Sequence, residues 1–233
     1  MMYRGPERGT ELAGRKKNPK QTEATRKAFL KKAYELFSTR NIETVSMIEI
    51  AKKSGYGTIT LYRYYSSKPD LVVAVAAWKW GEYMNENLGH ITAAGLANMT
   101  AYECFEFYLD SLLDLYDDRR DMLRFNQFFN IYVHSEHISP EAMAPYQEII
   151  EDLKDRFHII YEKAGEDRTL RTDISEEEMF STTIHLMLAA AARYAVGLVY
   201  IPENGFDDRK ELRTQKEMLL ARYGSMIAPA REQ

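Results

Sequence analysis

The chain has 233 residues, of which 45% are hydrophobic and 28% are charged. A wholly disordered chain would have far fewer hydrophobic side chains, so this composition predicts a globular protein. The longest uncharged apolar runs, residues 71–78 and 186–192, are much shorter than the ~20 residues that span a bilayer. The start, "MMYRGPERGT", contains no apolar segment of the secretory type. We therefore expect a cytoplasmic protein with no membrane span.

Charge is distributed unevenly along the chain. Residues 1–70 contain 15 Lys and Arg against 7 Asp and Glu, a net of +8, whereas residues 71–233 contain 16 against 28, a net of −12. This asymmetry favours a small basic module that meets a polyanion and a larger acidic module that does not. Chance clustering of solvated charges is the alternative at this stage.

From residue 22 onwards, apolar side chains recur at the spacing of one helix face. Residues 1–20, which include the basic run "GRKKNPK", lack this periodicity and are expected to form a flexible arm. No segment alternates apolar and polar residues convincingly enough for a strand, so the predicted fold class is all-α, with about nine helices. The helices are expected at 22–40, 46–55, 58–65, 67–88, 100–117, 119–133, 140–164, 175–199 and 207–226.

The boundaries of the early helices carry capping signals. Ser46 with Glu49, and Ser67 with Asp70, have the spacing of a capping box at a helix start. Asn41 stands where a left-handed residue would close the first helix.

Three short helices with a glycine turn before the third have the form of a helix-turn-helix. The segment "AYELFSTRNIETVSMIEIAKKSGYGTITLYRYYSSKPDLVVAV" contains "ELF", "S-x-x-E-I-A", the "G-Y" turn, "T-L-Y-R-Y-Y" and "S-K-x-D-L". In this order and spacing, it resembles the DNA-binding domain of the tetracycline-repressor (TetR) family of transcriptional regulators. After the arm at 1–20, the resemblance implies a DNA-binding domain at 21–67 and a helical ligand-binding and dimerisation domain at 68–233.

The start of the third helix is expected to face the DNA bases. By resemblance, Gly57, Thr58, Ile59 and Thr60 are DNA contacts; threonine can hydrogen-bond to a base edge and pack its methyl against thymine. Ile59 occupies a site where the family often has Gly or Pro, and no Arg, Asn or Gln lies between Gly57 and Leu61. The protein would then select its DNA sequence through thymine methyls, DNA shape and the arm.

Hydroxyl and ammonium groups around this helix are expected to contact phosphates. Tyr65 is instead expected to complete the core, and packing is the alternative for the other tyrosines as well. The arm cations could enter a minor groove, raise non-specific affinity or form a solubilising tail. The expected contacts are Ser46, Tyr62, Tyr64 and Lys68, with Arg15, Lys16, Lys17 and Lys20 from the arm.

Two C-terminal helices show apolar seams at three- and four-residue steps, the first within "SEEEMFSTTIHLMLAAAARYAVGLVY". Such seams pack against nearly parallel or antiparallel partners, and two from each chain would form a four-helix homodimer interface. A homodimer reads two half-sites of a pseudo-palindromic operator. Packing within one chain is the alternative. The expected interface residues are Phe180, Ile184, Met187, Ala191, Tyr194, Leu198, Leu219 and Tyr223.

The predicted helices around 102–116 and 122–132 are unusually aromatic. Their rings could line a pocket for a flat or hydrophobic ligand, or they could form a core; both can hold, because such pockets are openings in a core. The candidate ligand-binding residues are Phe105, Tyr108, Leu112, Phe125, Phe128, Phe129, Tyr132, Phe157, Tyr161 and His185.

Enzyme chemistry finds little support in the sequence. There is no glycine-rich phosphate loop, nucleophile elbow or Glu-x-x-His pair. We expect no cofactor and no metal site, although His134 and His137 have a conceivable ligand spacing. Cys104 is the single cysteine, so no internal disulfide forms, and we expect its thiol to be buried and inert.

The sequence therefore predicts a homodimeric transcriptional regulator, by resemblance a repressor, that is not an enzyme. Its partners would be double-stranded DNA and a small hydrophobic or aromatic effector. One alternative is a ligand-independent DNA-scaffolding or partner-binding protein with the same head. Another is a helical carrier or enzyme whose helix-turn-helix is only structural.

Overall fold

The computed structural model describes residues 19–89, 91–198 and 207–225. These residues form nine helices when α8, η2 and α9 are counted as one, which confirms the predicted all-α class. Their β-type backbone pairing is an isolated antiparallel bridge between Leu170 and Gly224. In chain order the elements are α1 (Pro19–Phe37), η1 (Ile42–Thr44), α2 (Met47–Lys53), α3 (Thr58–Tyr62), α4 (Lys68–Asn87), α5 (Ala101–Asp118), α6 (Arg120–Ser135), α7 (Pro140–Asp167), α8 (Glu176–Thr183), the π-helical η2 (Ile184–Leu188), α9 (Ala189–Ala195) and α10 (Asp208–Tyr223).

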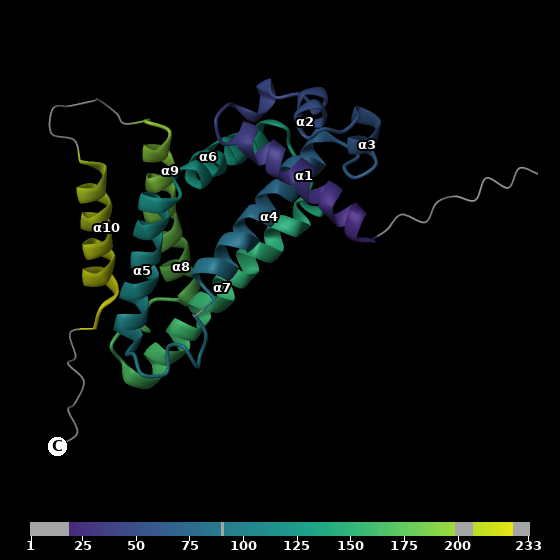
Figure 1. The fold of residues 1–233 in the computed structure, drawn as a ribbon. Helices are drawn as coiled ribbons and strands as arrows, with labels where there is room; N and C mark the ends of the chain where they lie inside the picture. Colours follow the sequence, from purple (N-terminus) through teal and green to yellow (C-terminus); the bar gives the residue numbers. More distant parts are fainter. Residues whose placement is uncertain (1–18, 90, 199–206, 226–233) are drawn as a thin grey trace, which may run out of the picture.

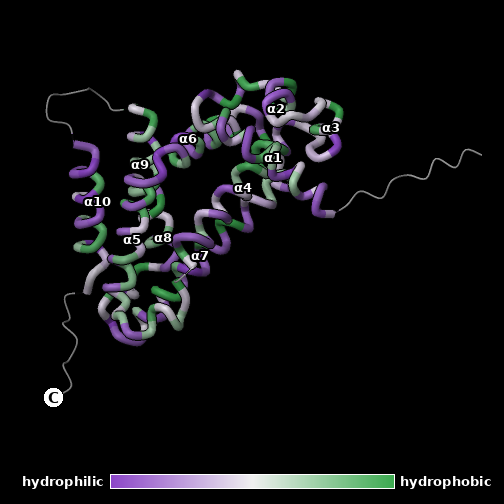
Figure 2. Tube along the Cα trace, viewed as in Figure 1, coloured by the Kyte–Doolittle hydropathy of each residue, from purple (hydrophilic) through white to green (hydrophobic). Residues whose placement is uncertain are grey.

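Helices α1, α2 and α3 form a head at one end of the molecule, and α4 to α10 form the body (Figure 1). Helix α4 runs from the head along α7, while α5, the α8–α9 helix and α10 stand together on the other side. Helix α6 lies between these two parts and packs against α9. Helix α10 is mostly hydrophilic (Figure 2) and packs on α5.

The capping signals in the sequence act as expected at two helix starts. The Ser46 hydroxyl accepts from the Glu49 amide at 3.1 Å, and Ser67 and Asp70 form a reciprocal capping box. The prediction for Asn41 is wrong: its φ is −53°, so it is not a left-handed residue that closes α1. Helix α1 ends earlier, at Phe37, and Asn41 begins the short turn η1, which the sequence pattern did not reveal.

The apolar core of the head includes side chains of the body. Phe125, Phe129 and Tyr132 of α6 are buried in the same cluster as the core residues of α1 to α3. The Tyr34 hydroxyl of α1 donates to the Asp121 carboxylate of α6 at 2.6 Å, and burial and this hydrogen bond raise the pKa of Tyr34. The expected division at residue 67 is therefore not a division in packing.

Aromatic rings hold the body together. Phe157 of α7 is fully buried, and its ring centre lies 6.1 Å from that of Phe105, 5.5 Å from Tyr108 and 5.5 Å from Phe180. Tyr223 of α10 lies edge-on to Phe105 at 5.9 Å. Each such pair adds about 0.5–1.5 kcal/mol to the burial of its rings. One ring cluster therefore joins α5, α7, α8 and α10.

Most of the residues that were predicted to form the dimer interface pack within one chain. Phe180, Met187, Ala191, Leu219 and Tyr223 are all buried in the body core of the protomer. A side chain that is already covered by its own chain has little area left for a contact between two chains, so packing within one chain, the alternative given above, accounts for these five residues.

The other three residues of that set differ. Ile184 and Tyr194 are half-buried, and Leu198 is 48% exposed. The Tyr194 hydroxyl donates to Glu211 at 2.6 Å, which ties α9 to α10.

Cys104 of α5 is buried, as predicted, and burial raises the pKa of its thiol. None of the helices in the described part of the chain combines the length and apolar character needed to cross a bilayer.

Replacing Phe157 with alanine should lower the free energy of unfolding by about 3–5 kcal/mol, because it leaves a cavity among three rings. Chemical denaturation at fixed protein concentration measures the loss. The matched control is Ile131→Ala on α6, whose side chain is 50% exposed and should change stability by less than about 0.5 kcal/mol. Equal losses in the two variants would contradict this account of the core.

Candidate nucleic-acid interface

The turn between α2 and α3 sets the position of the third helix. Gly55 has φ +77°, a left-handed conformation that glycine adopts at little cost. The next amide, of Tyr56, donates back to the Ala51 carbonyl of α2 at 3.1 Å. Ala51 and Leu61 are buried between the helices, as their small size and apolar character predicted. The turn therefore holds α3 against α2 and leaves its other side exposed.

The exposed side of α3 carries the residues that the sequence assigned to DNA. Ile59 is 74% exposed and Tyr62 is 50% exposed, while Thr58 and Thr60 are half-buried. Gly57 precedes the helix and is exposed. These residues form one surface at the end of the head, with short hydroxyl and apolar groups at the helix start and a phenol one turn later.

The tyrosines around α3 divide between surface and core. Tyr65 is buried, as predicted. Tyr64 is half-buried, and its ring centre lies 5.7 Å from that of Phe29. Tyr56 packs on the same ring at 5.2 Å. Tyr62, at 50%, is thus the most exposed tyrosine of this segment.

Two of the other predicted phosphate contacts have partners within the chain. The Ser46 hydroxyl oxygen caps α2, so its hydrogen is the group that it can offer to a phosphate. The Lys68 ammonium donates to the Glu43 carbonyl at 3.1 Å and lies 5.5 Å from the centre of the Tyr132 ring. Partial burial lowers the pKa of Lys68. Lys68 therefore also links η1, α4 and α6.

The predicted arm contacts are placed as follows. Lys20 lies in the first turn of α1 and is exposed. Arg15, Lys16 and Lys17 lie outside the described residues.

Sequence reasoning missed one prominent exposed residue of the neighbouring helix α2. Ile48 of α2 is 67% exposed. The signal was present, because Met47, Ile50 and Ala51 account for the buried face of α2 and leave Ile48 off that face. Exposed apolar residues on a DNA-facing element are thus visible as breaks in the helical pattern.

The predicted ligand-binding residues lie in two different cores and at the surface. The group divides between the two cores, with His185 exposed on η2 beside the Ser181 hydroxyl at 3.3 Å. Tyr161 is half-buried and its hydroxyl donates to the Ile174 carbonyl at 2.6 Å. The body core contains Phe105, Tyr108, Leu112 and Phe157, whereas the head core contains Phe125, Phe129 and Tyr132, with Phe128 packed against it.

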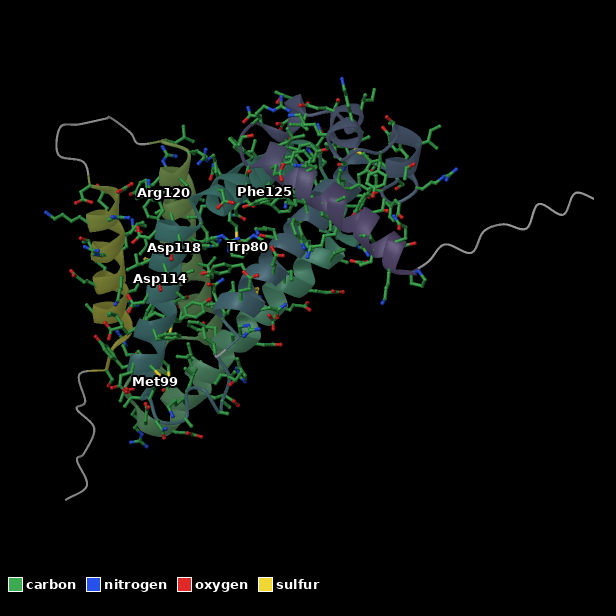
Figure 3. All side chains as sticks on the ribbon, in the orientation of Figure 1. Trp80, Met99, Asp114, Asp118, Arg120 and Phe125 are labelled. Atoms are coloured by element: carbon green, nitrogen blue, oxygen red, sulfur yellow. The ribbon has the colours of Figure 1, made fainter. Side chains whose placement is uncertain are left out.

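A cleft of about 270 Å³ opens between α4 and α5. Figure 3 shows Asp114 and Asp118 on α5, with Trp80 across from them on α4. The cleft is lined by Tyr83, Asn87, Phe107, Ser111, Asp114, Asp118 and Arg119.

Charge in this cleft is only partly compensated. The Arg119 guanidinium lies 6.0 Å from the centre of the Tyr83 ring and 3.9 Å from Glu86. Among the residues that the structure describes, neither Asp114 nor Asp118 has an ion-pair partner within 4.0 Å. Burial and the neighbouring carboxylates raise the pKa of Asp114, and burial together with Asp114 raises the pKa of Tyr83 to about 12.

A second cleft, of about 220 Å³, lies between α5 and α10. Asp114 lines this cleft as well, but the other two carboxylates here have partners: Asp117 pairs with Arg209 at 2.6 Å and Asp110 with Lys216 at 2.7 Å. These pairs join α10 to α5. The first cleft is therefore the better candidate for a ligand, because its acidic groups are still available.

Two sequence comparisons agree with the geometry of the head. Residues 29–75 match the family model described as bacterial regulatory proteins, tetR family. The uncharacterized HTH-type transcriptional regulator YvdT of Bacillus subtilis (strain 168) is 22% identical over 179 residues, which cover 77% of this chain and 87% of that protein.

Solved structures show the same fold over most of the chain. A proposed transcriptional regulator from Saccharomonospora viridis, in complex with choline, has a TM-score of 0.66 at 16% identity and covers 88% of this chain and 100% of its own. The transcriptional regulator FadR from Bacillus subtilis, in complex with stearoyl-CoA, has a TM-score of 0.64 at 14% identity, covering 84% and 97%. At such identities the likeness concerns the fold alone.

Replacing Tyr62 with phenylalanine should weaken binding to any duplex by about tenfold, the usual cost of a lost hydrogen bond to a charged group. Fluorescence anisotropy with a labelled duplex measures the change. Tyr65→Phe is the control, because its buried ring should leave DNA affinity unchanged. Wild-type affinity in Tyr62→Phe would remove this hydroxyl from the interface.

Proposed function

Because the chain belongs to the TetR family of bacterial regulatory proteins, we propose that it is a cytoplasmic, homodimeric repressor that releases its operator when a small ligand binds. Family and relatives are transcriptional regulators and not enzymes. The observation that carries DNA binding is the exposed side of α3. This helix lies within residues 1–70, which have a net charge of +8. A basic segment of this kind attracts the phosphate backbone while the helix meets the bases.

Two heads are needed for a specific operator, since one short helix makes few base contacts. The buried seam residues leave the outward faces of α9 and α10 for a second copy. Leu198 after α9 is 48% exposed and Met218 on α10 is 60% exposed, so both can contribute apolar area to an interface. We place the dimer contact there, with Ile184 and Tyr194 at its edge.

A short path connects the cleft in the body to the head. Arg119 lines the cleft and is also the residue at which α5 ends and α6 begins. Two residues later, Asp121 accepts the hydrogen bond from Tyr34 of α1. A ligand that moves Arg119 would therefore shift the start of α6 and, through it, the head. Such coupling requires that the ligand bind one arrangement of the heads more tightly than the other.

The lining of the cleft refines the expected ligand. The side chains of Tyr83 and Phe107 offer aromatic surface, while Asp114 and Asp118 offer negative charge. Aromatic faces and carboxylates together favour a ligand with an apolar part and a positively charged group. The similar structures in complex with choline and with stearoyl-CoA support ligand binding by this fold but not one ligand class.

The DNA-binding function predicts a steep salt dependence. The logarithm of the affinity for duplex DNA should fall linearly with the logarithm of the salt concentration, by nearly one unit of slope for each phosphate contacted. Lys52→Gln, at an exposed lysine of α2, should reduce that slope by about one unit. Glu151→Gln, an exposed position on α7, serves as the control. Affinity that does not respond to salt would contradict the proposal.

Ligand control predicts a response to organic cations that depends on Asp114. Benzyltrimethylammonium should raise the melting temperature and weaken operator binding, whereas its neutral isostere neopentylbenzene should do neither. Because the pKa of Asp114 is raised, the response should weaken on acidification at a higher pH than for an ordinary aspartate, as protonation removes the charge.

Asp114→Asn should abolish the response, and Asp117→Asn, at the carboxylate paired with Arg209, should keep it. An equal response in Asp114→Asn would exclude this cleft. Operator binding that no ligand alters would favour the DNA-scaffolding function instead.

A further inference from the structure

We propose that this protein selects its operator through the 5-methyl groups of thymine, read by Ile59 of α3 and by Ile48 of α2. The inference rests on the proposed DNA-binding function and adds the kind of base contact that gives it specificity. Ile59 and Ile48 are the two most exposed large apolar side chains of the described residues. The inference assigns both to one binding partner, the major-groove edge of T·A pairs.

Folding does not explain these two side chains. Ile59 is 74% exposed and Ile48 is 67% exposed. The core contacts of α2 and α3 come from Ile50 and Leu61, both fully buried. A single exposed isoleucine needs no explanation. Two of them, each in the first turn of one of the two packed helices of a helix-turn-helix, indicate an apolar partner on the outside.

Thymine supplies the apolar group that a major-groove base edge can offer. Its 5-methyl projects into the groove, whereas the edges of G, C and A present hydrogen-bond donors and acceptors. An isoleucine packed against a donor or acceptor would remove it from water without a replacement hydrogen bond, which is costly. The same side chain thus favours T·A pairs and disfavours the others at its position.

The rest of the surface fits this mode of reading. The first turn of α3 contains Thr58 and Thr60 beside Ile59, and no side chain there can make a bidentate hydrogen bond to a base. Exposed cations lie on both helices, Lys52 on α2 and Arg63 at the end of α3. They can hold the phosphate backbone while the isoleucines approach the bases. This positive surround favours DNA over an apolar protein surface as the occupant.

Deoxyuridine provides a direct test, because it keeps every hydrogen-bonding group of thymidine and lacks only the methyl. The full-length protein is used to select binders from random duplexes of about 30 base pairs, long enough for two half-sites. The preferred duplex is then made again with one thymine at a time replaced by uracil, and affinity is measured by anisotropy.

Loss of a methyl that contacts Ile59 should weaken binding about fourfold, and loss of the equivalent methyl in both half-sites about fifteenfold. Ile59→Ala should lose similar affinity for the thymine duplex and should become insensitive to uracil at that position. Ile48→Ala should do the same at a different position. Since both side chains are exposed, these variants should melt at the wild-type temperature.

Ile131→Ala is the matched control, because it also shortens an exposed isoleucine, here on α6 of the body. It should keep the full sensitivity to uracil. If the protein enriches a sequence but tolerates uracil at every position, the inference fails and the proposed function stands. Uracil sensitivity unchanged in Ile59→Ala would equally overturn it. No enrichment and no binding at low salt would instead reject the proposed function itself.

Discussion

The packing of α6 against the head is the contact on which the rest of the structure depends. Phe125 and Phe129 are fully buried among side chains of α1, α2 and α4, so the head has no complete core without the body. Aromatic side chains bury large areas, and their removal from such a site would expose that area to water. The orientation of the head is therefore tied to the position of α6.

This arrangement supports the proposed control of DNA binding by the body. Helix α6 begins at the joint with α5, beside the cleft that Arg119 lines, and its far end packs within the head. The Tyr34–Asp121 hydrogen bond adds a polar contact near the joint. Basic and acidic charge are also separated along the chain, so that the head attracts a polyanion while the body repels one. In the proposed function, DNA would therefore be attracted by the head and controlled from helices of the body, and the two share one core.

Much of the fold was predictable because its signals are local. Ser46 and Ser67 cap helices where the sequence predicted caps, and Gly55 adopts the positive φ that the turn requires. The helical pattern gave the length of each helix to within a few residues, and the motif of α2 and α3 indicated which side of α3 is exposed. Asn41 shows the limit of such reasoning, since α1 stops at Phe37 and Asn41 instead precedes η1, whose Ile42 is fully buried.

By itself the sequence determined the helices, their caps, the helix-turn-helix and the separation of charge, because each depends on residues within a few positions of one another. Only the tertiary structure decided which parts of the chain bury the apolar face of each helix. The seam with Met187 and Ala191 turned out to be buried in its own chain, and the aromatic residues assigned to one pocket divided between two cores. An apolar stripe shows that a helix must be covered, but its spacing is the same whether the cover comes from its own chain or from another.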